Sequence, residues 1–147
     1  MTPTLNGRLQ SRIVLVALIG IPLALILGVV LPRPNDDSTL GDMYQVFFTA
    51  LLIVAVVGLV WELLYHALQQ YRWEKDWPTL FGLITGVPEG ILTFLLLNAG
   101  IPFDFGDVPL KTFLPMFFIV WVSIWLVANG PLQIFFIRWR YRGGRFV

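Results

Sequence analysis

The sequence has no cysteine, a single histidine and few charged residues. Without cysteine, the chain forms no disulfide, no thiolate metal site and no cysteine nucleophile. Charged residues make up 13% of the chain, about half the share typical of soluble domains, which argues against a water-soluble globule. Hydrophobic residues make up 57%, which excludes a disordered chain. Ten Lys and Arg residues against nine Asp and Glu residues give too weak a basic field for nucleic-acid binding, so no nucleic-acid partner is expected.

Four long, almost uncharged runs predict four membrane-spanning helices. A helix needs about 20 mostly apolar residues to cross the hydrocarbon core of a bilayer. The predicted spans cover about residues 12–31, 43–69, 78–99 and 110–137. Because these runs take up most of the chain, we expect an all-α integral membrane four-helix bundle that forms a single transmembrane domain over residues 1–147. The first run is expected to be an uncleaved span, since Pro32-Arg33-Pro34 follows where a signal-peptide cleavage site would lie.

The positions of the basic residues predict that the N and C termini are both cytoplasmic. Most Lys and Arg residues lie beside the termini or between the second and third predicted spans, namely Arg8, Arg12, Arg72, Lys75, Arg138, Arg140, Arg142 and Arg145. The other two connections carry Arg33 and Lys111. Basic residues accumulate on the cytoplasmic side of a membrane. The sequence therefore predicts a multi-pass protein of the plasma (inner) membrane, with the lipid bilayer around it.

Small residues at four-residue spacing predict where helices approach one another closely. In lipid, contacts between large aliphatic side chains add little, so close packing through small residues holds a bundle together. The predicted helix-packing positions are Gly20, Ala24 and Gly28 in the first span and Gly82, Gly86 and Gly90 in the third. Each set lies on one helix face. The helix that covers such a face belongs either to this chain or to another subunit, and the sequence leaves both open.

The fourth predicted span carries an aromatic stripe and a break. The stripe consists of large rings at every fourth residue and is expected to face lipid: Phe113, Phe117, Trp121 and Trp125. Proline has no N–H to continue a helix, so Asn129-Gly130-Pro131 is expected to kink this span. Pro22 and Pro88 interrupt the first and third spans in the same way.

Glu89 is the one charged residue deep inside a predicted span. It lies about 16 Å from the cytoplasmic boundary, near the centre of a bilayer. A charge at that depth costs about 2.5–3.5 kcal/mol, and such residues mark functional sites or have a partner. No Lys or Arg is predicted in the interior of a span, away from its ends, so the cation candidates are His66 and, only by reaching inwards, Arg72 or Arg138. Glu89 is therefore expected to be protonated, to line a wet cavity or to meet a group of another protein.

Other polar residues of the cytoplasmic half are predicted to converge near Glu89. The candidate interaction or ion-pathway residues are Glu89, Glu62, His66, Asn129, Gln133 and Thr85. Carboxylate, imidazole and amide groups in series suit the passage of protons or cations. Glu62 and His66 equally fit a structural hydrogen-bonded pair, one helical turn apart. No metal site and no cofactor is predicted, because Glu-x-x-x-His with a single histidine is not a recognised metal-binding pattern.

These features predict two functions of different classes. The first is an accessory or scaffold subunit of a larger membrane complex, which packs against other membrane subunits through its glycine face and uses Glu89 as an anchor. The alternative is a small homo-oligomeric proton or cation transporter or channel that uses Glu89 and Glu62. An enzyme is not expected, because one histidine, no cysteine and no glycine-rich phosphate loop leave few groups for catalysis.

Overall fold

The computed structural model describes residues 4–33, 37–71 and 79–135, and in these ranges it contains helices and no strand. Four helical stretches, here called the first to fourth spans, are long and apolar enough to cross a membrane: Leu5–Val30, Leu40–Gln70, Leu80–Asn98 and Leu110–Phe135. The predicted all-α architecture with four such helices is confirmed over the described residues. The first helix begins at Leu5 rather than near residue 12, and this places Arg8 and Arg12 inside it.

Three of the spans are interrupted, whereas the second is one continuous helix, α3 (Leu40–Gln70). The first span consists of α1 (Leu5–Leu15), a π-helical turn η1 (Val16–Gly20) and α2 (Ile21–Val30). The third consists of α4 (Thr79–Ile84) and α5 (Gly86–Asn98), and the fourth of α6 (Leu110–Asn129) and α7 (Pro131–Phe135). Each interruption lies at, or within a turn before, the proline expected to cause it, because proline cannot donate the next helical hydrogen bond.

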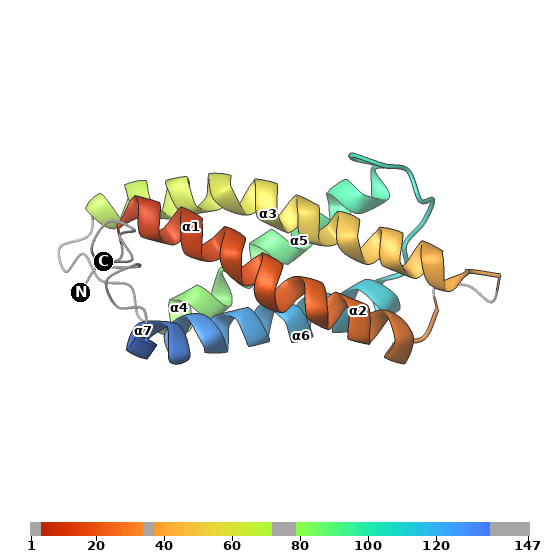
Figure 1. Ribbon diagram of the computed structural model, residues 1–147. Coiled ribbons are helices and arrows are strands. Elements are labelled where there is room, and N and C mark those ends of the chain that lie inside the picture. Colours follow the sequence, from red (N-terminus) through yellow and green to blue (C-terminus); the bar gives the residue numbers. More distant parts are fainter. Residues whose placement is uncertain (1–3, 34–36, 72–78, 136–147) are drawn as a thin grey trace.

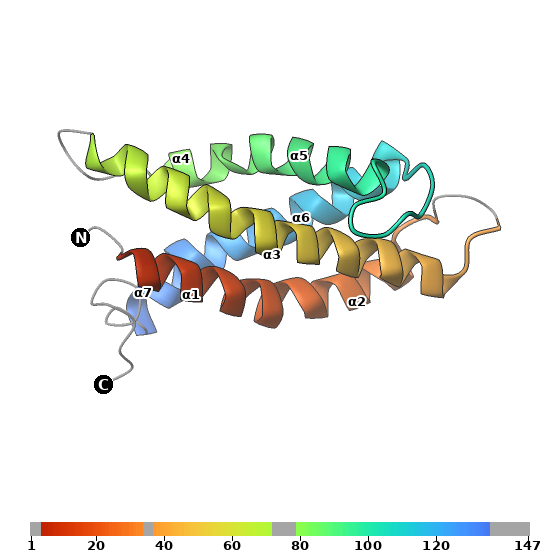
Figure 2. The same cartoon turned by 90° about the horizontal axis from the view of Figure 1, so that it is seen from above.

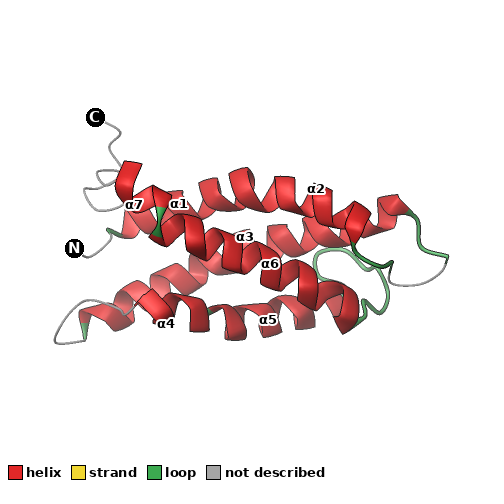
Figure 3. Ribbon diagram, turned by 90° about the horizontal axis from the view of Figure 1, so that it is seen from below, coloured by secondary structure: helices red, strands yellow, loops and turns green. Residues whose placement is uncertain are grey.

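The four spans form an antiparallel bundle (Figure 1). The helix α3 packs against α1 and α2 on one side and against α5 on the other, while α6 packs against the first span and against α4 and α5. The first and third spans therefore lie diagonally opposite each other (Figure 2). The start of α1, the end of α3, the start of α4 and α7 lie together at one end, here called the terminal end. Residues 31–33 and 37–39 and the connection 99–109 lie at the other end (Figure 3).

The orientation of the bundle in a membrane stays a prediction. Most of the basic residues on which that prediction depends lie outside the described residues: Arg72, Lys75, Arg138, Arg140, Arg142 and Arg145. Arg8 and Arg12, which also contributed to it, lie at the terminal end, inside α1.

The π-turn sets which face of the first span is buried. The buried positions of this span include Gly7, Ser11, Leu15, Gly20, Ala24 and Gly28. They follow one another every four residues, except for a step of five across η1. There the N–H of Ile21 bonds to the carbonyl of Val16, five residues back, so the turn takes up one extra residue. Consequently α1 and α2 bury one continuous face despite the change in spacing.

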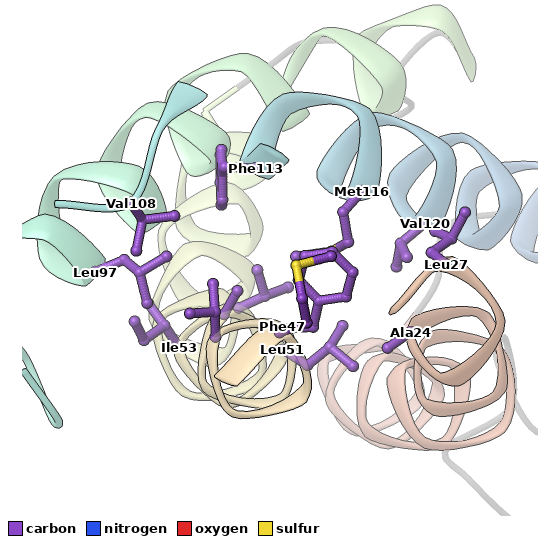
Figure 4. Packing of buried hydrophobic residues seen from close by; sticks show 14 of the residues in the cluster. Ala24, Leu27, Phe47, Leu51, Ile53, Leu97, Val108, Phe113, Met116 and Val120 are labelled. Atoms are coloured by element: carbon purple, nitrogen blue, oxygen red, sulfur yellow. The ribbon is translucent and has the colours of Figure 1, made fainter. Parts of the chain in front are cut away.

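The interior of the bundle has an apolar half and a polar half. In the half away from the terminal end, Phe47 and Leu51 of α3 pack with Met116 and Val120 of α6 and with Ala24 of α2 (Figure 4). In the terminal half, the interior between α1, α3 and α5 is occupied by charged side chains instead. Those side chains form the candidate site.

Candidate functional site

Arg12 of α1 lies between two carboxylates from two other spans. Its Nη1 donates to Oε1 of Glu62 on α3 at 3.2 Å, and its Nη2 forms an ion pair with Oε1 of Glu89 on α5. The Arg12 side chain is 10% exposed and that of Glu89 is 1% exposed. The contact with Glu89 crosses the diagonal of the bundle, from the first span to the third. The prediction that Glu89 lacks a buried cation in its own chain is therefore wrong.

The physical reason is the length of the arginine side chain. An arginine near the end of a membrane-spanning helix carries its guanidinium several ångströms along the helix surface. The sequence-based expectation directed the Arg12 charge towards water, at the edge of the first span. Inside the bundle, the guanidinium finds two carboxylates, and mutual pairing offsets the cost of removing all three charges from water.

Arg8 extends the same set of contacts towards the terminal end. Its Nη1 lies 3.4 Å from Oε2 of Glu62, and its Nη2 donates to the side-chain oxygen of Gln69 at 2.6 Å. Glu62 thus binds both arginines, one through each carboxylate oxygen. We call Arg8, Arg12, Glu62 and Glu89 the ion-pair network. With two guanidinium groups and two carboxylates, its formal charge is zero.

Gly58 and Trp121 make the space in which the Arg12 guanidinium lies. A Cβ atom at Gly58 would overlap the guanidinium, so only glycine at this position of α3 leaves room for it. On the other side, Cζ of Arg12 lies 5.6 Å from the centre of the Trp121 ring, within the range of a cation–π interaction. The indole Nε1 of Trp121 donates to the carbonyl of Leu83 in α4 at 3.2 Å. Trp121 thus links the arginine to the interrupted third span.

The glycine face of the third span packs against the aromatic stripe of the fourth span. A Cβ at Gly86 would overlap the Trp121 indole, and a Cβ at Gly90 would lie 2.7 Å from Cε1 of Phe117. The rings of Phe117 and Trp121 stack 5.9 Å apart along the same ridge. The expectation that the aromatic stripe faces lipid is therefore wrong for these rings, because glycine on α5 exposes a backbone surface flat enough for them to cover.

The small residues of the first span are also covered from within the chain. Ala24 is fully buried, and a Cβ at Gly20 would lie 3.2 Å from a Leu51 methyl group of α3. A Cβ at Gly28 would overlap the ring of Tyr44, whose hydroxyl donates to the carbonyl of Leu25 at 3.1 Å. Of the two possibilities left open by the sequence, the structure thus supplies a covering helix from the same chain for both glycine faces.

The other predicted site residues bond locally instead of joining the ion-pair network. The Thr85 hydroxyl donates to the carbonyl of Gly82 at 2.9 Å. The side-chain amide of Asn129 donates to the carbonyl of Trp125 at 2.9 Å, and its oxygen accepts from Gln133 at 3.3 Å. These bonds satisfy backbone groups beside the helix breaks, which is a structural role.

His66 lies one turn from Glu62 on α3 towards the terminal end, on the same helix face. Its Nδ1 is buried and has no hydrogen-bond partner among the described residues. The predicted convergence is therefore partial: the structure joins Glu62 and Glu89 through an arginine, with His66 at the edge of the site.

Sequence reasoning missed Arg8, Arg12 and Trp121 as members of the site. A signal for the arginines was present, because residues four apart on a helix share a face, so Arg8 and Arg12 lie on the same side of α1. In the described part of the chain, no group of three or more His, Cys, Asp or Glu side chains is arranged to hold a metal ion.

No protein-family model matches the chain, and neither a curated protein nor a solved structure is found to be similar to it.

Replacing Gly86 by alanine is expected to lower the free energy of unfolding by about 2 kcal/mol, because the new methyl group forces Trp121 out of its place on α5. The matched control is Gly82→Ala in α4, where a Cβ meets Trp125 at 3.6 Å, an ordinary contact. Unfolding in mixed detergent micelles, followed by tryptophan fluorescence, measures both. Equal stability of the two variants would contradict the packing of Trp121 on Gly86.

Proposed function

We propose that this chain is a small multi-pass protein of the plasma (inner) membrane that moves protons through Glu89 and Glu62, with its terminal end in the cytoplasm. The proposal rests on the environment of the Oε2 atom of Glu89. This oxygen is buried and has no hydrogen-bond partner in the described part of the chain, while Oε1 holds Arg12. Ionisable side chains buried within a membrane bundle are costly and mark proton or ion pathways. A free oxygen on such a carboxylate is a place for a proton.

Contacts of Arg12 with both carboxylates allow Glu89 to be ionised or neutral. While Glu89 is ionised, it forms an ion pair with Arg12 and the two charges compensate each other. When Oε2 takes up a proton, Glu89 becomes neutral, and Arg12 keeps its bond to Glu62. Neither state leaves the carboxyl group as an isolated buried charge, which is the condition for a group that gains and loses a proton repeatedly.

The charge balance of the network favours protons over metal cations. Both carboxylates already face guanidinium groups, so the site presents no net negative charge to attract a cation. A metal ion would have to displace Arg12 from one of them, whereas a proton needs a single oxygen lone pair. Of the two kinds of transport that the sequence left open, protons or metal cations, the network therefore favours protons.

Hydroxyl groups provide the buried polar atoms beyond Glu89. Among the described residues of the apolar half, the buried polar side chains are Thr49, Thr93 and Thr112. Thr93 lies one turn beyond Glu89 on α5 and donates to the Glu89 carbonyl at 2.8 Å, and the Thr112 hydroxyl is buried without a hydrogen-bond partner there. A hydroxyl both accepts and donates a hydrogen bond, so it can pass a proton.

The test is proton entry into liposomes that contain the purified protein and a pH-sensitive dye. With an inward proton gradient and potassium plus valinomycin to cancel any membrane potential, the wild-type protein should acidify the lumen faster than protein-free liposomes do. Glu89→Gln should reduce the rate to that of protein-free liposomes, because the amide has no carboxylate oxygen to accept a proton. The matched control is Asp107→Asn, the same chemical change at an exposed position, which should leave the rate unchanged.

A wild-type rate equal to that of protein-free liposomes would overturn the proposal. The role of a scaffold subunit would then become the leading one, and it predicts that a second membrane protein co-purifies in mild detergent. Two observations that motivated the scaffold role now have an explanation within the chain, since Arg12 pairs with Glu89 and Trp121 covers Gly86. Assembly with other subunits, or into a homo-oligomer, stays a prediction that the mass of the purified particle tests.

A further inference from the structure

The formal charges of the ion-pair network cancel one another. Arg8 and Arg12 contribute two positive charges and Glu62 and Glu89 two negative ones. The side chains of Arg12 and Glu89 are at least nine-tenths buried. A single uncompensated charge at such a position is strongly unfavourable, because the surrounding side chains leave it little contact with water. Any proton that binds to Glu89 therefore raises the question of what compensates Arg12.

The groups around Glu89 do not supply that compensation. On α1 the charged residues are Arg8 and Arg12, which are both positive. On α3 the titratable groups of this region are Glu62, Tyr65 and His66, and protonation of His66 would add a further positive charge. Glu89 is the titratable residue of α5, and α6 carries only Lys111, at its far end. Within the described residues, Glu62 is left alone to face both arginines.

The Arg12 guanidinium also has N–H groups that can donate hydrogen bonds to an anion. Its Nη2 faces Glu89, and its Nε is buried without a hydrogen-bond partner among the described residues. When Glu89 becomes neutral, Nη2 loses its charged acceptor. A guanidinium donates several N–H groups in one plane, and it binds anions through them.

We infer that each proton taken up by Glu89 is accompanied by a small monovalent anion that binds at Arg12, so that the protein moves a proton and an anion together. The inference rests on the proposed function and adds its co-substrate. The proton binds to Oε2 and turns the carboxylate into a carboxylic acid, which raises the charge of the network from zero to plus one. The anion returns it to zero. Burial of Arg12 and Glu89 and the Trp121 ring beside Arg12 restrict this position to a small anion, and chloride is the probe.

Two ionic conditions separate this coupling from the movement of protons alone. In chloride medium, the coupled process carries no net charge, so proton entry should be equally fast with and without potassium and valinomycin. In gluconate medium, whose anion is too large, proton entry should fall to the rate of protein-free liposomes. An inward gradient of one pH unit should also drive up to about a tenfold accumulation of labelled chloride, since the two gradients balance at one-to-one coupling.

Glu89→Gln supplies an independent readout, because its side chain is permanently neutral like protonated Glu89. This variant should no longer move protons, yet it should exchange labelled chloride across the membrane at a rate that does not depend on pH. The control is Arg12→Ala combined with Glu89→Gln, which should not exchange chloride.

Proton entry that is fast in gluconate and requires valinomycin would overturn the coupling and leave the proposed function intact. Absence of proton entry in every medium would overturn the proposed function and the coupling with it. If the wild-type protein moves protons but the Glu89→Gln variant does not exchange chloride, the assignment of the anion to Arg12 is overturned.

Discussion

The Arg12→Ala variant is expected to lose about 3–5 kcal/mol of unfolding free energy in detergent, because it leaves the buried carboxylate of Glu89 without a counter-charge. Glu62 retains Arg8, so the loss comes mainly from Glu89. Denaturant unfolding in mixed micelles, followed by circular dichroism, measures the effect. The double variant Arg12→Ala/Glu89→Gln should recover a large part of the loss, since it has no buried charge at position 89.

The matched control is Arg33→Ala. Arg33 is exposed and donates to the carbonyl of Ser38 at 3.2 Å, so its removal should change the unfolding free energy by less than about 0.5 kcal/mol. If Arg12→Ala were as stable as Arg33→Ala, Arg12 would not be paired inside the bundle, and the ion-pair network would have to be abandoned.

The Gly58→Ala variant is expected to lower the unfolding free energy by about 2–3 kcal/mol, because the added methyl group overlaps the Arg12 guanidinium. The displaced guanidinium also makes weaker contacts with both carboxylates. In an Arg12→Ala background the same change should cost almost nothing, since the space is then empty and alanine favours a helix more than glycine does. The four unfolding free energies form a double-mutant cycle whose coupling energy reports the contact between positions 12 and 58.

Gly41→Ala is the control on the same helix. A Cβ there lies 3.4 Å from the Thr39 hydroxyl, an ordinary contact, so this variant should be as stable as the wild-type protein. Strict additivity of Gly58→Ala and Arg12→Ala would show that the guanidinium does not lie against Gly58.

The architecture was predictable because it follows from local properties of the chain. Length and hydropathy of a segment decide whether it can cross a bilayer, and proline interrupts a helix wherever it lies, as Pro131 does between α6 and α7. The importance of Glu89 was visible for the same reason, since the cost of burying a carboxylate depends on depth and not on the identity of its neighbours. Gly86 and Gly90 likewise predicted a close contact between two helices, but they did not show which helix makes it.

The partner of Glu89 was not predictable, because two non-local features decide it. Along an uninterrupted α-helix, Arg12 would lie about 120° around the axis from Ala24, on a different face of the first span. The π-turn at Val16–Gly20 absorbs one residue, roughly 100° of rotation, and brings Arg12 to the buried side. In addition, the guanidinium reaches the third span only because Gly58 on the second has no side chain in its way.

The sequence by itself determined that this protein has four long apolar helices, where three of them are interrupted, and that a carboxylate lies buried in the third. Each of these follows from a run of neighbouring residues. Only the tertiary structure decided that Arg12 holds Glu89 and that Trp121 covers Gly86. These contacts join residues from different spans, and their formation depends on the helical register and packing distance of the whole bundle, which no single segment encodes.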